Sequence, residues 1–170
     1  MSYKCNPTSR KSLREYALYI RKALGCDSIY FPIVEFLELL PWIYPELTYS
    51  IVESTEMPDN IHADIDVLNK VIRIKEKIYD GACDGNGRDR FTIAHEIGHF
   101  LLMSEGGVSY AKSTTKPKAY EDPEWQADAF AGELLVPIHK LKRYKKATTV
   151  AKRCGVSLSC AEFMMKIKNN

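Results

Sequence analysis

The segment 88–103 constrains the fold most, because it is a helical pattern in which polar side chains form only a narrow stripe. Apolar residues cover most of its circumference, which is typical of a helix buried in a core. The polar residues recur at spacings of three and four, and they are Arg88, Thr92, His95, Glu96 and His99. Each buried polar group without a partner would cost roughly 1–3 kcal/mol. We therefore expect this stripe to face a cleft, an ion or its own members.

Two histidines of this stripe, His95 and His99, are four positions apart. Their side chains then lie one helical turn apart, about 6 Å along the axis. Both imidazoles can reach one Zn²⁺ ion at about 2.0–2.1 Å. Glu96 lies beside them and can contact a water molecule on the ion without binding the ion itself. A lone histidine is more often a satisfied core residue, but the full His-Glu-x-x-His pattern on such a helix favours a metal site.

A catalytic zinc ion needs three protein ligands and one position for water. The predicted helix 122–136 offers Glu124 and Asp128, which are four residues apart and share a face. If Glu124 binds the ion, Asp128 can accept the free ring N–H of a histidine ligand and fix its orientation. A carboxylate that only complements the helix dipole is the other interpretation of Glu124. The alternative third ligands are His62, His139, Glu121 and Glu133.

The remaining chain predicts helices around a small sheet, an α+β fold. The period changes from helical to alternating near residue 47 and returns to helical near residue 88. We expect helices over 8–24, 30–40, 88–103 and 122–136, strands over 47–52, 63–68 and 71–74, a turn-rich loop over 80–87, a polar surface connection over 104–118, and short helices over 138–170. The length suits a single domain over 1–170, with a core at about 45–140 and a helical tail over 141–170.

Composition excludes several classes of protein. The 24 basic and 22 acidic residues give a net charge of +2, which does not mark a nucleic-acid-binding protein. The five cysteines are odd in number and lack Cys-x-x-Cys spacing, so we expect neither a disulfide framework nor a thiolate zinc cage. The polar N-terminus and the absence of a long apolar run favour a cytoplasmic protein that does not enter the membrane.

Two blocks of the chain resemble the signature of the ImmA/IrrE metallopeptidases, which are zincins of the gluzincin type. The first runs from Arg88 to Leu102 and contains His95-Glu96-Ile97-Gly98-His99, and the second runs from Glu124 to Pro137. The resemblance covers roughly residues 60–140. A common family form has Asn where Asp128 stands and Met where Val136 stands, and we expect neither difference to disturb zinc binding.

The resemblance implies a zincin-like fold with one Zn²⁺ ion per chain, bound by His95, His99 and Glu124, and Glu96 as the catalytic base. It also implies a zinc-dependent endopeptidase that cleaves a helix-turn-helix transcriptional repressor and so derepresses genes of a phage, a mobile element or a stress response. The donor that stabilises the oxyanion stays open among Tyr110, Tyr120, His139 and Arg88.

The C-terminal segment supports rival interpretations. Residues 150–157 resemble the first helix and turn of a helix-turn-helix, with Gly155 in the turn. Basic residues gather before and within it: Lys140, Lys142, Arg143, Lys145, Lys146, Lys152 and Arg153. They indicate either contact with DNA or a repressor, or a packed tail with a solvated basic face. A DNA-binding regulator with a structural zinc and a non-catalytic zincin-like sensor therefore remain as alternative functions.

Overall fold

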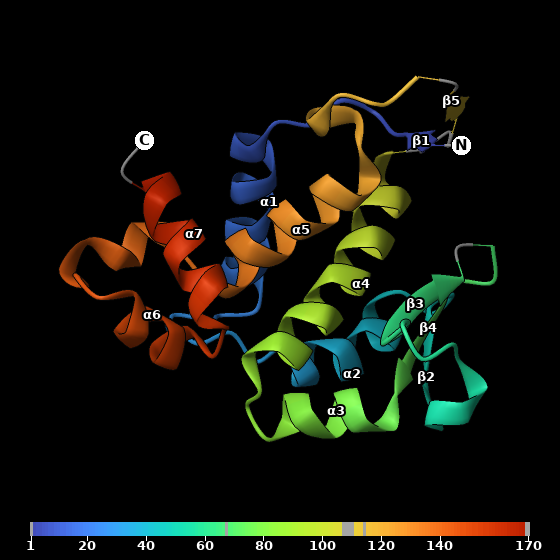
Figure 1. The fold of residues 1–170 in the computed structure, drawn as a ribbon, viewed down its shortest axis with the longest axis horizontal. Coiled ribbons are helices and arrows are strands. Elements are labelled where there is room, and N and C mark those ends of the chain that lie inside the picture. The colour runs from blue at the N-terminus through green and yellow to red at the C-terminus, as the bar shows by residue number, and fades with distance from the viewer. Residues whose placement is uncertain (1, 67, 107–110, 114, 169–170) are drawn as a thin grey trace.

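The computed structural model describes residues 2–66, 68–106, 111–113 and 115–168, and it confirms the α+β fold (Figure 1). Its elements in chain order are β1 (Ser2–Lys4), α1 (Arg10–Ala23), α2 (Ile33–Ile43), β2 (Thr48–Val52), the 3₁₀ helix η1 (Ser54–Glu56), β3 (Ala63–Asp66), β4 (Val71–Lys75), α3 (Glu76–Cys83), α4 (Gly87–Gly106), β5 (Ala111–Ser113), η2 (Ala119–Glu121), α5 (Pro123–Leu135), η3 (Ile138–Arg143), α6 (Ala147–Cys154) and α7 (Leu158–Lys168). Among the helices described, none is long and apolar enough to cross a membrane.

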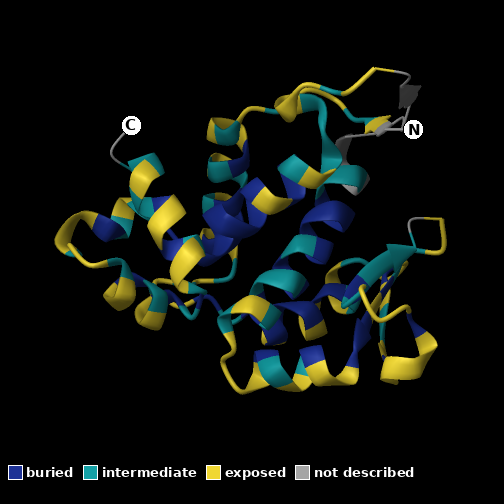
Figure 2. Cartoon of the chain, in the orientation of Figure 1, coloured by how far each residue is buried: buried dark blue, intermediate teal, exposed yellow. Residues whose placement is uncertain are grey.

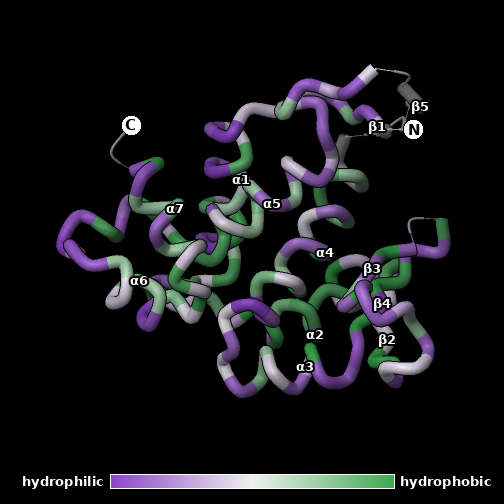
Figure 3. Tube along the Cα trace, viewed as in Figure 1, coloured by the Kyte–Doolittle hydropathy of each residue, from purple (hydrophilic) through white to green (hydrophobic). Residues whose placement is uncertain are grey.

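The central element is α4, which separates two groups of elements (Figure 1). The three-stranded sheet, α2 and α3 lie on one side of it, and α1, α5, α6 and α7 lie on the other. Buried residues concentrate where α4 and α5 face each other and where α2 meets α4 (Figure 2). The segment that leads into α6 is largely hydrophilic, whereas α2 is hydrophobic along most of its length (Figure 3). The helix that carries the predicted zinc ligands His95 and His99 is thus the packing centre of the fold.

The small sheet has the strand order β2-β4-β3. Strand β4 pairs in parallel with β2 and antiparallel with β3, so β3 is an edge strand. The side chains of Ile72 and Ile74 on β4 are fully buried and join the sheet to the core. Both β3 and β4 contact α4, so this part of the sheet lies beside the helix that carries the two histidines.

Helix α5 approaches α4 closely because Gly98 has no side chain. A Cβ atom at this position would lie 3.0 Å from the ring of Phe130 and 3.4 Å from the Cα atom of Ala127. Such a Cβ would be tighter than an ordinary van der Waals contact against Phe130, which is fully buried. The glycine inside the His-Glu-x-x-His motif therefore sets how near the predicted ligand Glu124 can come to the histidines.

The turn between α6 and α7 is fastened to the start of α4. Arg90 is only 1% exposed, and its guanidinium donates to the carbonyl oxygens of Gly155 at 2.8 Å and Phe31 at 2.7 Å. A Cβ atom at Gly87 would lie 2.3 Å from the carbonyl carbon of Val156. Gly155 itself has a φ of 64°, a left-handed conformation that favours glycine. The C-terminal helices therefore have a defined position against the N-terminal end of α4.

Three features differ from the sequence expectations. Helix α3 occupies half of the segment predicted as a loop over 80–87, because Ile78 and Ala82 are buried and Gly81 packs against Asp89. Helix α2 continues through Pro41 to Ile43 instead of ending near residue 40. Strands β1 and β5 form a second, two-stranded sheet that was not predicted. Part of the predicted connection over 104–118 lies outside the described residues.

Candidate metal centre

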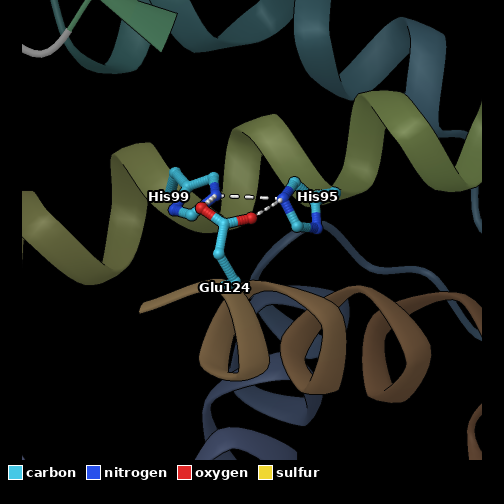
Figure 4. Close-up of side chains that lie close together, drawn as sticks. All are labelled: His95, His99 and Glu124. Carbon is cyan, nitrogen blue, oxygen red and sulfur yellow. Dashed lines mark hydrogen bonds and ion pairs between the residues drawn. The ribbon is translucent and has the colours of Figure 1, made fainter. Parts of the chain in front are cut away.

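Three side chains from two helices converge at the cleft between α4 and α5. His95 and His99 are one turn apart on α4, and Glu124 reaches toward both from the first turn of α5 (Figure 4). The two histidine Nε2 atoms are 2.9 Å apart. The carboxylate oxygens of Glu124 lie 3.3 Å from each of them. Ligand atoms at about 2.0–2.1 Å from a tetrahedral ion are about 3.3 Å apart, so the spacing fits one zinc ion.

The start of α5 fixes where Glu124 lies. The side chain of Asp122 caps this helix and accepts a hydrogen bond from the backbone N–H of Glu124 at 3.0 Å. Pro123 follows at the first helical position, where its fixed φ angle suits the helix. The side chain of Glu124 is 69% exposed, so solvent and a substrate can reach this side of the site.

Asp128 lies one turn further along α5 and holds the other side of His95. Its Oδ1 atom is 2.8 Å from His95 Nδ1. A carboxylate only accepts hydrogen bonds, so His95 donates from Nδ1 and directs Nε2 toward His99 and Glu124. This is the contact expected of a carboxylate that orients a histidine ligand, and the structure places it where the spacing of Glu124 and Asp128 predicted.

The pKa values of the site are shifted because several carboxylates lie close to two imidazoles. Burial on its own lowers the pKa of His95, but hydrogen bonds with Asp128 and Glu124 outweigh it and raise the pKa to about 10. Hydrogen bonds from His95 and His99 lower the pKa of Glu124. Burial raises the pKa of Glu96 despite the two nearby imidazoles. A metal cation bound between these imidazoles and carboxylates would satisfy the same groups.

Comparison with known proteins identifies the family. The sequence profile of the IrrE N-terminal-like domain, a peptidase family, matches residues 55–166. The chain belongs to this family. The matched segment contains all three clustered side chains and Glu96. At the level of the family, the chain is therefore of the metallopeptidase type.

A solved structure shows the same fold as this IrrE-type chain. A Mycobacterium tuberculosis transcriptional regulator superposes with a TM-score of 0.59 at 17% sequence identity. The alignment covers 89% of this chain and 45% of the regulator, so the chain spans less than half the length of that protein. No curated protein matches the sequence.

The alternative third ligands of the IrrE-type site lie away from the cluster. Glu133 is 1% exposed and is held by Arg10 and Arg14 of α1, each at 2.9 Å. The carboxylate of Glu121 lies 3.6 Å from the ammonium group of Lys4. His62 lines a second cavity, and His139 belongs to η3. Among the residues that the structure describes, only His95, His99 and Glu124 form a group able to hold a metal ion.

None of the described oxyanion candidates lines the cavity at the metal centre. This cavity has a volume of about 610 Å³ and is bordered by the cluster, Glu96, Pro123 and the edge strand β3. Tyr120 is 42% exposed beside Lys118, His139 is on η3, and Arg88 lines the second cavity. Tyr110 lies outside the described residues.

Tyr3 is a residue of this cavity that the sequence did not suggest. It comes from β1, which pairs antiparallel with β5, and it is 49% exposed. Asp64 of β3 borders the same cavity. A tyrosine near the start of the chain, in a polar segment without periodicity, carries no local signal of a functional role. Its position depends on a strand pair that joins residues more than a hundred positions apart.

Proposed function

We propose that this chain is a zinc-dependent endopeptidase that cleaves a helix-turn-helix transcriptional repressor. The observation that carries the proposal is the convergence of His95, His99 and Glu124 on one point, with Glu96 beside them on α4. Membership of a peptidase family supports the reaction type. The fold similarity to a transcriptional regulator fits a role in gene control.

The residues of the site suit the hydrolysis of a peptide bond. His95, His99 and Glu124 would hold the zinc ion, which supplies Lewis acidity and a water molecule whose pKa is near 7 when bound. Glu96 is 8% exposed, and its raised pKa suits a group that accepts a proton from the attacking water and delivers it to the leaving amine. Asp128 keeps His95 in the tautomer that leaves Nε2 available to the ion.

The edge strand β3 offers a binding track for the substrate backbone. Ala63, Asp64 and Ile65 line the cavity, and the outer edge of β3 has no strand partner within the described residues. An extended polypeptide can add to such an edge through main-chain hydrogen bonds. The proposed cleavage point is therefore an extended segment of the repressor, such as a linker, and not a residue within a folded helix.

Tyr3 is the donor that we propose for the developing oxyanion. Tyr3 lines the cavity at the metal centre, whereas Tyr120 does not. Removal of one oxyanion donor typically lowers kcat by about 10²–10³-fold. The Tyr3→Phe variant should show a loss of this order with little change in KM, and Tyr120→Phe is the matched control. Equal activity of Tyr3→Phe and the wild type would exclude this role.

The decisive experiment incubates the chain with the repressor encoded beside it. We expect cleavage with zinc, no cleavage with a chelator, and recovery when zinc is restored. Glu96→Gln should retain one zinc ion per chain and lose cleavage by about 10²–10⁴-fold, the usual contribution of general acid–base catalysis. If Glu96→Gln cuts at the wild-type rate, the proposed mechanism is wrong.

The same experiment separates two rival functions. A non-catalytic sensor would bind the repressor and leave it intact with or without zinc. A DNA-binding regulator is favoured by one observation, the helix–turn–helix arrangement of α6, Gly155 and α7 beside basic residues. It would bind DNA with an affinity that falls steeply with salt, and zinc would serve only stability.

A further inference from the structure

A second cavity of about 540 Å³ lies beside the metal centre. Its walls come mainly from the N-terminal half of α4, from α5 and from one side of α7. Four large apolar side chains dominate it, and we call it the aromatic pocket: Phe91, Trp125, Phe163 and Met164. Phe163 is 53% exposed, so part of its ring is open to a ligand.

The aromatic pocket continues the cleft that holds the metal centre. Along α4, the residues that line it are Arg88, Phe91 and Thr92, directly before the metal-site residues 95, 96 and 99. Along α5, Pro123 and Glu124 border the metal cavity, and Trp125 and Asp128 border the pocket. Asp128 also holds His95 at 2.8 Å, so one side chain belongs to both places. A polypeptide that crosses the metal centre toward the start of α4 would meet the pocket next.

Among the polar groups at the pocket, Asp128 is held by His95, and Arg88 favours a peptide that carries an acidic residue near an apolar one. Arg88 is exposed, and within the described contacts its guanidinium has no hydrogen bond or ion pair. The guanidinium of Arg10 lies 5.2 Å from the ring centre of Phe163 and is already paired with Glu133. Arg88 is therefore the cation that remains available for a carboxylate of the ligand.

We propose that the aromatic pocket binds a large apolar side chain of the polypeptide substrate close to the bond that is cut. This inference rests on the proposed endopeptidase function and names the sequence preference of that site. The volume lies in the range of sites that bury small ligands, about 300–1,000 Å³. Because α7 supplies Phe163 and Met164, the C-terminal helical segment takes part in substrate selection.

The first test measures binding without cleavage. The chain has two tryptophans, and Trp42 is 85% exposed on α2, so Trp42→Phe leaves Trp125 as the single reporter in the pocket. Glu96→Gln is added to prevent cleavage. The probes are two acetylated pentapeptides, Ala-Asp-Phe-Ala-Ala and Ala-Asp-Ala-Ala-Ala. Burial of the phenyl ring should make the first bind about tenfold tighter or more, with a saturable change in Trp125 fluorescence.

The second test asks whether α7 forms the pocket. Phe163 and Leu158 are both exposed apolar residues of α7, but only Phe163 lines the pocket. Phe163→Ala should remove most of the preference for the phenylalanine peptide, and Leu158→Ala should keep it. Circular dichroism confirms that both variants are folded. Equal binding of the two peptides, or an unchanged preference in Phe163→Ala, overturns the proposal.

The outcomes also distinguish a failure of the pocket proposal from a failure of the endopeptidase proposal. If the unmodified protein cuts its repressor but shows no preference for the phenylalanine peptide, the pocket proposal fails alone. If the preference is present and no cleavage occurs, the endopeptidase proposal fails and the pocket is still a peptide site. Sedimentation gives a third outcome: a dimer that Phe163→Ala dissociates, without any peptide preference, would make the pocket a contact between two copies and overturn the proposal.

Discussion

The two ends of α5 carry glutamates with opposite surroundings. Near its start, Glu124 is 69% exposed in its side chain and faces two imidazoles at 3.3 Å. Near its end, Glu133 is 1% exposed and forms ion pairs with Arg10 and Arg14. Arginine is charged at every accessible pH, so the second site is permanently paired. Imidazoles can give up a proton, so the first site can exchange it for a metal ion.

The contrast distinguishes a buried carboxylate that holds two helices together from an exposed one that can take part in chemistry. Glu133 connects α5 to α1 with three hydrogen bonds from two guanidinium groups. Both oxygens of its carboxylate accept at least one of these hydrogen bonds. Glu124, His95 and His99 have one another and Asp128 as neighbours, and they gain a shared partner only when a cation joins them. The predictions below test whether this division between a structural end and a metal end is correct.

The largest effect is expected at the structural end. Glu133→Gln leaves two guanidinium groups without their anion, so it should lower the free energy of unfolding by about 3 kcal/mol, the lower end for a broken buried pair. The lower end applies because the side chains of Arg10 and Arg14 keep 20% and 30% exposure. Urea denaturation measures the change. Zinc binding to the folded variant should keep its stoichiometry.

Glu121→Gln is the matched control, because Glu121 precedes the same helix and pairs with Lys4 at the surface at 3.6 Å. Surface pairs contribute about 0–1 kcal/mol, so this variant should be nearly as stable as the wild type. If Glu133→Gln is as stable as Glu121→Gln, the structural end has been misidentified.

At the metal end, Glu124→Gln should weaken zinc binding by about 100-fold or more. Loss of a carboxylate that only supports a metal ligand already lowers metal affinity by about 10–100-fold. The zinc-free variant should unfold within about 1 kcal/mol of the wild type, since the exposed carboxylate contributes as a surface pair does. Calorimetric titration and urea denaturation give the two values. Wild-type zinc affinity in this variant would show that Glu124 is not a ligand.

Asp128→Asn should weaken zinc binding by about 10–100-fold, less than the loss of Glu124, because Asp128 acts on the ion only through His95. An amide oxygen can still accept the Nδ1–H bond, so Asp128→Ala should bind zinc more weakly than Asp128→Asn. Competition with a chromophoric chelator measures both. A larger loss for Asp128→Asn than for Glu124→Gln would reverse the assignment of ligand and supporting residue.

How far the sequence could predict these sites depends on the distance over which each is encoded. His95, Glu96 and His99 are encoded within five residues of one helix, so the periodicity placed them on one stripe, and the structure brings the two histidines together. The sequence could only favour Glu124 over Glu133 as the third zinc ligand. The arginines that form ion pairs with Glu133 lie on α1, more than a hundred residues away in the chain. The roles of His95, His99 and Glu124 in zinc binding stay predictions.

The fold shows the same dependence on range. The α+β class, the three-stranded sheet and α4 follow from local periodicity, and the structure confirms them. Helix α3 was missed because Gly81 and Asp80 favour a loop locally, whereas burial of Ile78 and Ala82 selects a helix in the folded protein. Tyr3 lines the metal cavity because β1 pairs with β5, and no local sequence pattern could indicate this pairing.

The smallest expected effect is the coupling between the two ends of α5. Glu124 and Glu133 are nine residues apart, about 13 Å along a helix, and share no partner in the described contacts. Their changes in zinc-free unfolding free energy should therefore add within about 0.5 kcal/mol in the double variant Glu124→Gln/Glu133→Gln. A coupling well above this value would mean that the ion pairs with α1 help to hold α5 at the distance that the metal site requires, and the two ends would then be one cooperative unit.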